Sequence, residues 1–567
     1  FLATNLPQLG LNDIPPHLWL PLHTKLANGV VDANAAFCYA VDGDDMCVIG
    51  GPGGVGTDTV YLLPHAVTLR TTDMVPLLTS TPGAMDRVKH ILGHAGWPVA
   101  KPPAVEATHR NMWPALEGYR LMSDTSIAGT SVWFLLNEFG ARFRHSDTPN
   151  VRMATVRHGG EVLTVLWATE PIADGEEATR DYAAASSTPD ARLVQELLVK
   201  RDVPAAPFLD ARAALEAADG KFPSGSAVIA AACGAAGAGA ETLPGGTLRV
   251  FTDSPAVRDH LHRPDFEFVD TPEGADILWT LEDLENAGVA ATDAFANHFP
   301  GEMALTSKRG LAKTAYAALG RRGAAWLPVT FDMTDDAELM AFVGEYHRRA
   351  LAGEDNHWIL KAINRARSED CFVTPTLAAA LRIGDTWSRV ACKYIHRCLL
   401  FDGCKFDLRY IVVVRSFQPL ELAVCNTFWI RFANNKYTLD PESMGDYETH
   451  FTVMNYGETA MRQMGHEEFI AAIEAEHDGL EWAGVNRAVH ASIKELFACA
   501  AVTGDVAHPR RRAEFGVDVM VDEDLHSHIL EVTMSPDTAR ANLYTKGYCD
   551  AVFGYLFRGE DRLMTAL

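Results

Sequence analysis

The chain has 567 residues, 48% of them hydrophobic and 22% charged, a composition typical of ordinary globular domains. A chain of this length exceeds what one hydrophobic core can support, so we expect roughly two to four domains. The formal net charge of −25 repels nucleic acid at long range, and we therefore expect no direct contact with nucleic acid.

Cysteine usage and the apolar runs indicate the compartment. The 10 cysteines include no CxxC pair, which argues against a zinc ribbon or a disulfide framework and favours a reducing compartment. The first residues, FLATNLPQLGLNDIPP, lack the basic region and unbroken apolar core of a signal peptide. The run FPSGSAVIAAACGAAGAGA has too few large apolar residues to span a membrane. We expect a cytoplasmic protein that does not enter a membrane, and the nucleus stays open as a second location.

Residues 30–183, after an N-terminal segment of residues 1–29, have the pattern of a β-rich domain. Short apolar runs rich in β-branched and aromatic residues are separated by Gly, Asp and Pro turns. We expect strands at AFCYAV, MCVIGG, TVYLLP, SVWFLL and VLTVLWAT, and a helix at RVKHILG. The glycine-rich run at residues 50–59 has no lysine where a phosphate loop needs one, so we expect a hairpin loop between two strands.

The composition changes at residue 184. Residues 184–245 combine polar turns, a helix around ARLVQELLVKR and the Ala/Gly-rich tract, and we expect a helical linker. From residue 246 to residue 567 short strands alternate with helices, as in α/β domains. Strands are expected at TLRVFTD, ADILWT, HWILKAI, KFDLRYIVVVRS and HILEVTMSP, and amphipathic helices at EEFIAAIEAEH and NRAVHASIKELFACAAV. The fold class expected for the whole chain is multidomain α+β.

Two polar motifs of the β-rich domain carry residues that could do chemistry: RHSDTPN at residues 144–150 and GEEATRDY at residues 175–182. In this order they resemble the core of the SET methyltransferase family, which implies a SET-like β-fold. That family begins the first motif with an Asn that helps to hold S-adenosylmethionine, whereas Arg144 would bring a cation toward a cationic sulfonium. We therefore expect no S-adenosylmethionine binding and no methyl transfer. The SET-like motif residues expected to be inactive are Arg144, His145, Asn150 and Tyr182.

The C-terminal half carries a second and more extensive resemblance. The segments that carry it are NHFPGEMALTSKRGL, HWILKAINRARSED, CKYIHRCLLFDGCKFDLRYIVVVRS, FWIRF, HFTVMNY, FGVDVMVD and HILEVTMSPD. In this order, over most of residues 246–567, they resemble the tubulin–tyrosine ligase-like family, and within it the branch in which a SET-like domain precedes the ligase-like domain. The resemblance implies an ATP-grasp domain that joins an amino acid to a protein tail, with tubulin or microtubules as the partner.

Ligation of this kind activates a carboxylate as an acyl phosphate, so the site must hold a triphosphate with cations and Mg²⁺ with oxygen ligands. Lys405, Asp407 and Arg409 alternate along one expected strand and so share one of its faces. The roles themselves are implied by the resemblance. The implied ATP-binding residues are Lys308, Lys361, Lys393, Tyr394, Lys405 and Asp407. The implied catalytic residues are Arg409, Arg431 and Glu531, and the implied magnesium ligands are Asp518, Glu531 and, as a weak ligand, Thr533.

Four positions depart from the family pattern. Active members carry a glycine-rich phosphate loop, and here the segment is RARSED at residues 365–370, with no glycine and two acids. Such a segment cannot bring bare backbone N–H groups close to phosphate as a glycine loop does. In addition, Thr533 replaces an Asn metal ligand, Val453 replaces a second Asn, and Cys392 replaces a Gln. We therefore expect ATP and Mg²⁺ to bind weakly and the full ligation cycle to fail.

Three hypotheses on function follow from the two resemblances. The leading hypothesis is a pseudoenzyme that binds tubulin or modulates the modification of its tail, with or without nucleotide. The first alternative is an active ATP-dependent ligase that adds an amino acid to the tail of tubulin or of another protein. The second alternative is a SET-like protein that binds histone tails. A ligase needs a positive groove for its acceptor and a histone reader an acidic one, so the charge of that groove discriminates between them.

Overall fold

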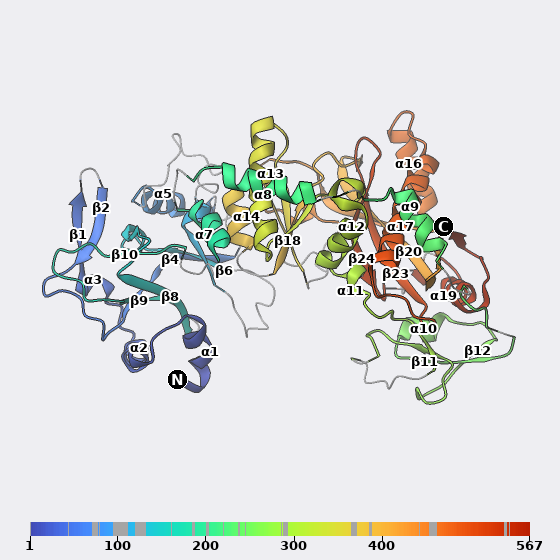
Figure 1. Cartoon of the computed structure of the whole chain (residues 1–567), viewed down its shortest axis with the longest axis horizontal. Helices are drawn as coiled ribbons and strands as arrows, with labels where there is room; N and C mark the ends of the chain where they lie inside the picture. The colour runs from blue at the N-terminus through green and yellow to red at the C-terminus, as the bar shows by residue number, and fades with distance from the viewer. Residues whose placement is uncertain are drawn as a thin grey trace.

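A computed structural model gives the course of the chain, which is elongated, with the N-terminal domain at one end and the C-terminal domain at the other (Figure 1). The structure describes all residues except 1, 43–44, 71–76, 79, 95–111, 120–131, 160, 184–187, 200–202, 219, 221, 236–238, 244, 285, 287–292, 364–370, 385–387, 441–442, 453–461, 538–540 and 544.

The N-terminal domain is built from short strands and helices in the order that the sequence predicts. Its elements are α1 (Leu2–Leu11), η1 (Pro16–Leu18), α2 (Trp19–Ala27), α3 (Ala33–Ala36), β1 (Phe37–Asp42), β2 (Asp45–Gly50), β3 (Tyr61–Leu63), β4 (His65–Arg70), α5 (Ala84–His94), η3 (Trp113–Ala115), β5 (Leu116–Tyr119), β6 (Val132–Leu136), η5 (Gly140–Arg142), β7 (Arg144–His145), β8 (Val151–His158), β9 (Glu161–Ala168) and β10 (Thr179–Arg180). The strands form a β1–β2 hairpin, a five-stranded sheet of order β3-β9-β8-β10-β7, and a three-stranded sheet of order β4-β6-β5.

The glycine-rich run at residues 50–59 is a loop, but the prediction that it closes a hairpin is wrong. It leaves β2, which pairs with β1, and leads to β3, which pairs with β9 in another sheet. The loop packs against the segment after β9, where the N–H of Gly50 donates to Glu176 O at 2.8 Å. Gly54 has φ +73°, and a Cβ on it would lie only 2.7 Å from Ile172 O. The glycines thus allow a close backbone contact.

The described part of residues 184–245 forms α7 (Pro189–Glu196), α8 (Ala206–Ala218) and α9 (Gly225–Cys233). The Ala/Gly-rich tract is therefore more than the tether that its composition indicates. Ser224 caps α9 by accepting from the N–H of Ala227, and the small side chains let the helix pack closely, with Val228 and Ala232 buried in the C-terminal core. Figure 1 shows α8 beside α13, with which it is in extensive contact.

The C-terminal domain contains three sheets and the longest helices of the described chain. Its elements are β11 (Leu248–Thr252), α10 (Pro255–His260), β12 (Phe266–Phe268), β13 (Ile277–Trp279), β14 (Phe295–Ala296), α11 (Met303–Thr306), α12 (Lys308–Gly323), β15 (Thr330–Asp332), α13 (Asp336–Ala352), β16 (Trp358–Ala362), β17 (Phe372–Thr374), α14 (Leu377–Gly384), β18 (Arg389–Lys393), β19 (Leu400–Phe401), β20 (Cys404–Phe417), β21 (Leu420–Cys425), β22 (Trp429–Lys436), α15 (Tyr447–His450), α16 (His466–Glu476), α17 (Trp482–Thr503), β23 (Ala513–Val521), β24 (Ser527–Met534), α19 (Tyr548–Phe553), η7 (Gly554–Arg558) and β25 (Met564–Ala566).

The three sheets of this domain differ in strand direction. The first is parallel, of order β12-β11-β13-β14, and the second is antiparallel, of order β15-β18-β16-β17. The third and largest is antiparallel and runs β24-β23-β20-β21-β25, with β19 and β22 also pairing with β20. Helix α17 covers the largest sheet because its apolar residues recur at helical spacing, with Val485, Val489, Ile493 and Leu496 buried in the same core.

The two domains share one hydrophobic core. Trp113 and Trp133 of the N-terminal domain are buried in the same cluster as Trp358 and Phe372 of the second C-terminal sheet. The rings of Trp113 and Phe372 meet edge to face with centroids 5.6 Å apart. Packing of this kind joins the three-stranded sheet of the N-terminal domain to the β15–β18–β16–β17 sheet as one compact body.

Two further observations concern the whole chain. All 10 cysteines are free thiols. Within the described residues, no helix combines the length and the apolar character that crossing a membrane requires.

Candidate functional site

A cavity lies between the β15–β18–β16–β17 sheet and the largest sheet, with an empty volume of about 720 Å³ that includes space open to solvent. Its walls come from both sheets and from the start of α12. Nine residues that the sequence predicts for the site line it: Lys308, Lys361, Lys393, Tyr394, Lys405, Asp407, Arg431, Asp518 and Glu531. The two other predicted residues, Arg409 and Thr533, do not line the cavity.

The floor of the cavity is β20, and its period of two places the polar side chains. Lys405 and Asp407 face the cavity, whereas Phe406 between them and Leu408 after them are fully buried in the core on the other side. Arg409 continues the polar face, but its guanidinium turns to Asp518, its cross-strand neighbour on β23. The shared face predicted for these residues is therefore present, although only two of the three side chains reach the cavity.

The opposite wall is formed by β16 and β18. In β16 the buried residues Trp358 and Leu360 alternate with Ile359 and Lys361, which face the cavity. The Lys361 ammonium donates to Leu530 O at 3.4 Å, a long hydrogen bond that crosses to the other sheet. Among the described residues Lys361 has no carboxylate partner, so its charge is available to an anion.

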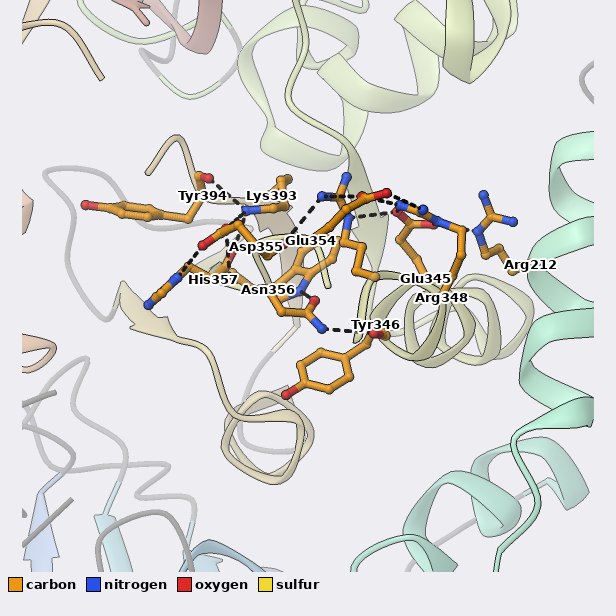
Figure 2. A network of polar contacts seen from close by, with 12 residues as sticks. Arg212, Glu345, Tyr346, Arg348, Glu354, Asp355, Asn356, His357, Lys393 and Tyr394 are labelled. Carbon is orange, nitrogen blue, oxygen red and sulfur yellow. Dashed lines mark hydrogen bonds and ion pairs between the residues drawn. The ribbon is translucent and has the colours of Figure 1, made fainter. Parts of the chain in front are cut away.

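Lys393, at the end of β18, is held by a polar network that Figure 2 shows. Its ammonium pairs with Asp355 and donates to His357 O at 2.9 Å and to Tyr394 O at 3.0 Å. Burial opposes ionisation of Asp355, but the hydrogen bonds from His357 and Lys393 outweigh it and hold the pKa of Asp355 well below its ordinary value. The charge of Lys393 is therefore already neutralised.

The same network reaches the linker helix α8. Arg348 of α13 donates to Glu354, which precedes Asp355 in the chain, at 2.8 Å, and it also donates to Glu345. Glu345 in turn pairs with Arg212 of α8. Burial would raise the pKa of Glu345, but its hydrogen bonds from Arg348 and Arg212 and the charge of Arg349 lower it to about 2. An ionic chain thus connects α8 to a wall of the cavity.

Lys405 is the most deeply buried cation of the cavity, with only 3% of its surface exposed. Its ammonium donates to the Tyr394 hydroxyl at 2.8 Å and lies 4.0 Å from the centre of the Tyr394 ring. The Tyr394 hydroxyl donates to Nδ1 of His450 at 3.0 Å, since burial lowers the pKa of His450 to about 4 and keeps the ring neutral. Burial lowers the pKa of Lys405 to about 8, and nearby Lys361 adds to the effect.

The carboxylates of the cavity are engaged by arginines. Arg431 of β22 donates to both oxygens of Asp407, at 2.6 and 2.7 Å, and to Oδ2 of Asp518 at 2.8 Å. Arg409 donates to both oxygens of Asp518 from the other side. Burial opposes ionisation of Asp518, but these two guanidinium groups keep its pKa below the ordinary value. Thr452 donates its hydroxyl to Asp407 and completes this buried cluster.

The second predicted magnesium ligand, Glu531, is also paired. Its Oε1 accepts from the Lys308 ammonium at 2.9 Å. Asp518 and Glu531 face each other as register partners on the adjacent strands β23 and β24. Thr533 is the register partner of Gly516, two residue pairs further along, and its short side chain stays outside the cavity.

Two of the four departures from the family pattern, the RARSED segment at residues 365–370 and Val453, lie outside the described residues. Cys392 lines the cavity, where the Thr330 hydroxyl donates to its sulfur at 3.4 Å. Sequence reasoning missed Asp355 and Cys371. Burial raises the pKa of the Cys371 thiol, which also lines the cavity, to about 11, so it stays protonated.

The SET-like motif residues make internal contacts. The side chain of Asn150 donates to Glu177 O and accepts from the N–H of Thr179, both at 2.8 Å, and so clips the two motifs together. The Tyr182 hydroxyl donates to Phe143 O at 2.8 Å. Since its hydrogen goes to this carbonyl, the hydroxyl is engaged in holding the fold.

The two cationic groups beside these residues are also engaged. The Arg180 guanidinium lies 3.6 Å from the centre of the Tyr182 ring and covers it. Arg144 lies 3.5 Å from a carboxylate oxygen of Glu177. Nδ1 of His145 accepts weakly from the N–H of Tyr182 at 3.4 Å. All four motif residues therefore support the crossing of β7, β8 and β10.

Comparisons with known proteins agree with this architecture. Residues 288–565 match the tubulin-tyrosine ligase family, and residues 51–201 match the tubulin tyrosine ligase SET-like domain. Tubulin–tyrosine ligase-like protein 12 of Mus musculus is 32% identical, with 99% of this chain and 94% of that protein aligned. The protein of the same name from Homo sapiens is 31% identical over 98% of this chain and 93% of its own length. The predicted fold class, a SET-like domain before a ligase-like domain in a multidomain α+β chain, is confirmed.

A wider set of relatives matches the C-terminal domain alone. A tubulin monoglutamylase of Homo sapiens is 28% identical over 271 residues, which cover 42% of this chain and 21% of that enzyme. The named activities of such relatives act on tubulin, whereas full-length similarity is to proteins named only as ligase-like.

Proposed function

This chain belongs to the tubulin-tyrosine ligase family, and on that premise we propose that it is a pseudoenzyme that binds tubulin and a nucleoside triphosphate without ligating an amino acid. One observation carries the proposal. The two carboxylates that a ligase would present to metal are both held by cations of the chain itself, Asp518 by Arg409 and Arg431, and Glu531 by Lys308.

The residues of the cavity fit a nucleoside triphosphate. Lys361 and Lys405 have no carboxylate partner among the described residues and both face the cavity, so their ammonium groups suit phosphate oxygens. Bound ATP would supply the phosphoryl group that activates a carboxylate. Tyr394, fixed by Lys405 and His450, and Lys393, fixed by Asp355, would border its base.

The ligation step should fail because groups that it requires are not positioned at the cavity. Arg409 is predicted as a catalytic residue, but its guanidinium donates hydrogen bonds to Asp518. Thr533 replaces an Asn and lies outside the cavity, so it adds no ligand near the reacting groups. Misplacement of reacting groups by about 1 Å can reduce a rate by roughly a hundredfold. Several such defects act on one site here.

Two observations support tubulin as the partner: the names of the relatives and the positive charge at the start of α12. Relatives of the C-terminal domain are named as tubulin-modifying enzymes. Helix α12 begins at Lys308 on the cavity wall, and its next cations, Arg309 and Lys313, share one carboxylate, Asp332. This excess of positive charge suits an acidic tail that leads into the cavity. Contact with tubulin would place the protein in the cytoplasm.

The alternatives receive less support. An active ligase is the second candidate function, because the cavity is lined by Lys308, Lys361, Lys405 and Glu531. For the SET-like domain we propose no methyl transfer, since the Tyr182 hydroxyl is engaged by Phe143 O. No feature of the described residues favours histone tails as the partner.

Binding of the full chain to microtubules tests the proposal, with microtubules lacking their C-terminal tails for comparison. We expect co-sedimentation that weakens on removal of the tails. The substitution Lys313→Glu, at a side chain that is 57% exposed, should weaken binding about threefold to tenfold at low salt. The matched control is Arg322→Glu, the same charge change on a 79% exposed side chain at the far end of α12, which should change little. Equal binding by all variants, or none by the unmodified chain, would refute tubulin engagement through this surface.

A further inference from the structure

We infer that the cavity binds a nucleoside triphosphate without a divalent metal ion. The inference rests on the proposed function, because it takes the cavity to be a nucleotide site. Its basis is a mismatch between the residues of the cavity and the requirements of Mg²⁺. Magnesium demands near-octahedral oxygen coordination and usually takes one or two carboxylates together with phosphate oxygens and water.

The carboxylate oxygens that could serve as ligands are occupied. Both oxygens of Asp518 accept from guanidinium groups, and both oxygens of Asp407 accept from Arg431. Oε1 of Glu531 accepts from Lys308. Among the described lining residues, Oε2 of Glu531 is thus the one oxygen of these three carboxylates without a donor. A metal bound to Asp518 would sit against two guanidinium groups, whose repulsion in a buried site is strong.

Removing these pairs to admit a metal is costly. Asp407 and Asp518 are 2% and 4% exposed, and Arg431 is buried between them. Breaking a buried ion pair leaves an uncompensated charge in a medium of low dielectric constant. The acids of the cavity are therefore structural partners of its arginines, and they are poor candidates for ligands that a metal could recruit.

The cationic side chains of the cavity favour a triphosphate that carries no metal. Five cationic side chains line the cavity, and three of them, Lys308, Lys393 and Arg431, already have carboxylate partners. The other two, Lys361 and Lys405, oppose each other electrostatically, since Lys361 contributes to the lowered pKa of Lys405. A triphosphate without metal carries more negative charge than its magnesium complex, so it relieves this repulsion better. The ammonium groups of the two lysines would neutralise the phosphate charge that a magnesium ion neutralises in a ligase.

Titration of the purified full chain with ATP, in EDTA and separately in excess Mg²⁺, tests the inference by calorimetry. We expect ATP to bind in EDTA at least as tightly as in Mg²⁺. Lys361→Met and Lys405→Met should each weaken ATP binding in EDTA about tenfold. Glu531→Gln should tighten it, because the change removes a negative charge from the cavity wall.

Two results would overturn the inference: ATP binding that appears only with Mg²⁺, or loss of ATP binding in Glu531→Gln. Absence of ATP binding in both buffers would overturn it as well. The microtubule assay separates these failures from failure of the tubulin-binding part of the proposed function, since it measures binding to tails without added ATP. Unfolding curves of each variant show whether a loss reflects a fold that is no longer intact.

Discussion

The buried ammonium of Lys405 lowers the stability of the fold. Its ammonium is almost fully buried, and a hydroxyl and an aromatic ring replace the carboxylate that usually accompanies such a group. The pKa of about 8, lowered by burial, reports that the charged form is disfavoured in the fold. A residue of this kind is expected where an anion binds.

We therefore predict that Lys405→Met stabilises the protein at pH 7 when no nucleotide is present, by about 1–3 kcal/mol. The folded-state pKa of Lys405 lies below the unfolded value, so its penalty is largest below pH 8 and fades as the pH rises toward 10.5. The advantage of the variant should shrink over the same interval in melting curves at pH 7 to 10. The matched control is Lys393→Met, which strands Asp355 and should destabilise. Destabilisation by both variants would mean that Lys405 has an acidic partner.

At the scale of the element, β23 carries a second buried acid, four residues from Asp518 and on the same face of the sheet. Glu514 is 5% exposed and accepts from the Tyr548 hydroxyl of α19 at 2.8 Å. Burial raises the pKa of Glu514 to about 7, although the bond from Tyr548 works against the rise. Ionisation of this carboxyl should therefore destabilise the fold, because the cost of burying its charge exceeds what the Tyr548 hydrogen bond contributes.

The predicted consequence is a pH dependence that one substitution removes. The folded-state pKa of Glu514 exceeds its unfolded value of 4.5, so stability is lost as the pH rises from about 4.5 through 7. Glu514→Gln should exceed the parent in stability by about 1–3 kcal/mol at pH 8 and match it near pH 5. Chemical denaturation at pH 5, 6, 7 and 8 measures this. The exposed Glu267→Gln should not alter the pH profile, and a parallel profile for both variants would contradict the account.

Elements also show where sequence reasoning succeeds and where it fails. Lys405 and Asp407 can be placed on one face of β20 because side chains of a strand alternate, a local rule. The partner of Glu531 cannot be found in this way, because Lys308 lies 223 residues away and meets it only through the packing of α12 on β24. Asp355 precedes β16 in an irregular turn, where no periodicity marks it as the partner of Lys393. The glycine run at residues 50–59 misled for the same reason, since its contacts are long-range.

At the scale of the whole molecule, the SET-like domain is built into the ligase-like domain. The two domains share the core around Trp113 and Trp358, and the polar network from Arg212 to Lys393, which Figure 2 shows, ends at the wall of the cavity. The residues of the SET-like motif thus hold together a domain that packs against the sheet bearing one wall of the cavity. The central claim is therefore that this ligase-like fold binds without ligating.

The most direct test of that claim is incorporation of labelled amino acid into tubulin. The purified full chain is incubated with tubulin, ATP, Mg²⁺ and, separately, labelled tyrosine, glutamate or glycine, beside Glu531→Gln as the blank. The account predicts incorporation no higher than the blank for each amino acid. Thr533→Asn alone should not restore it, because Asp518 and Glu531 stay paired with cations. Incorporation by the unmodified chain that Glu531→Gln abolishes would contradict the account and identify an active ligase.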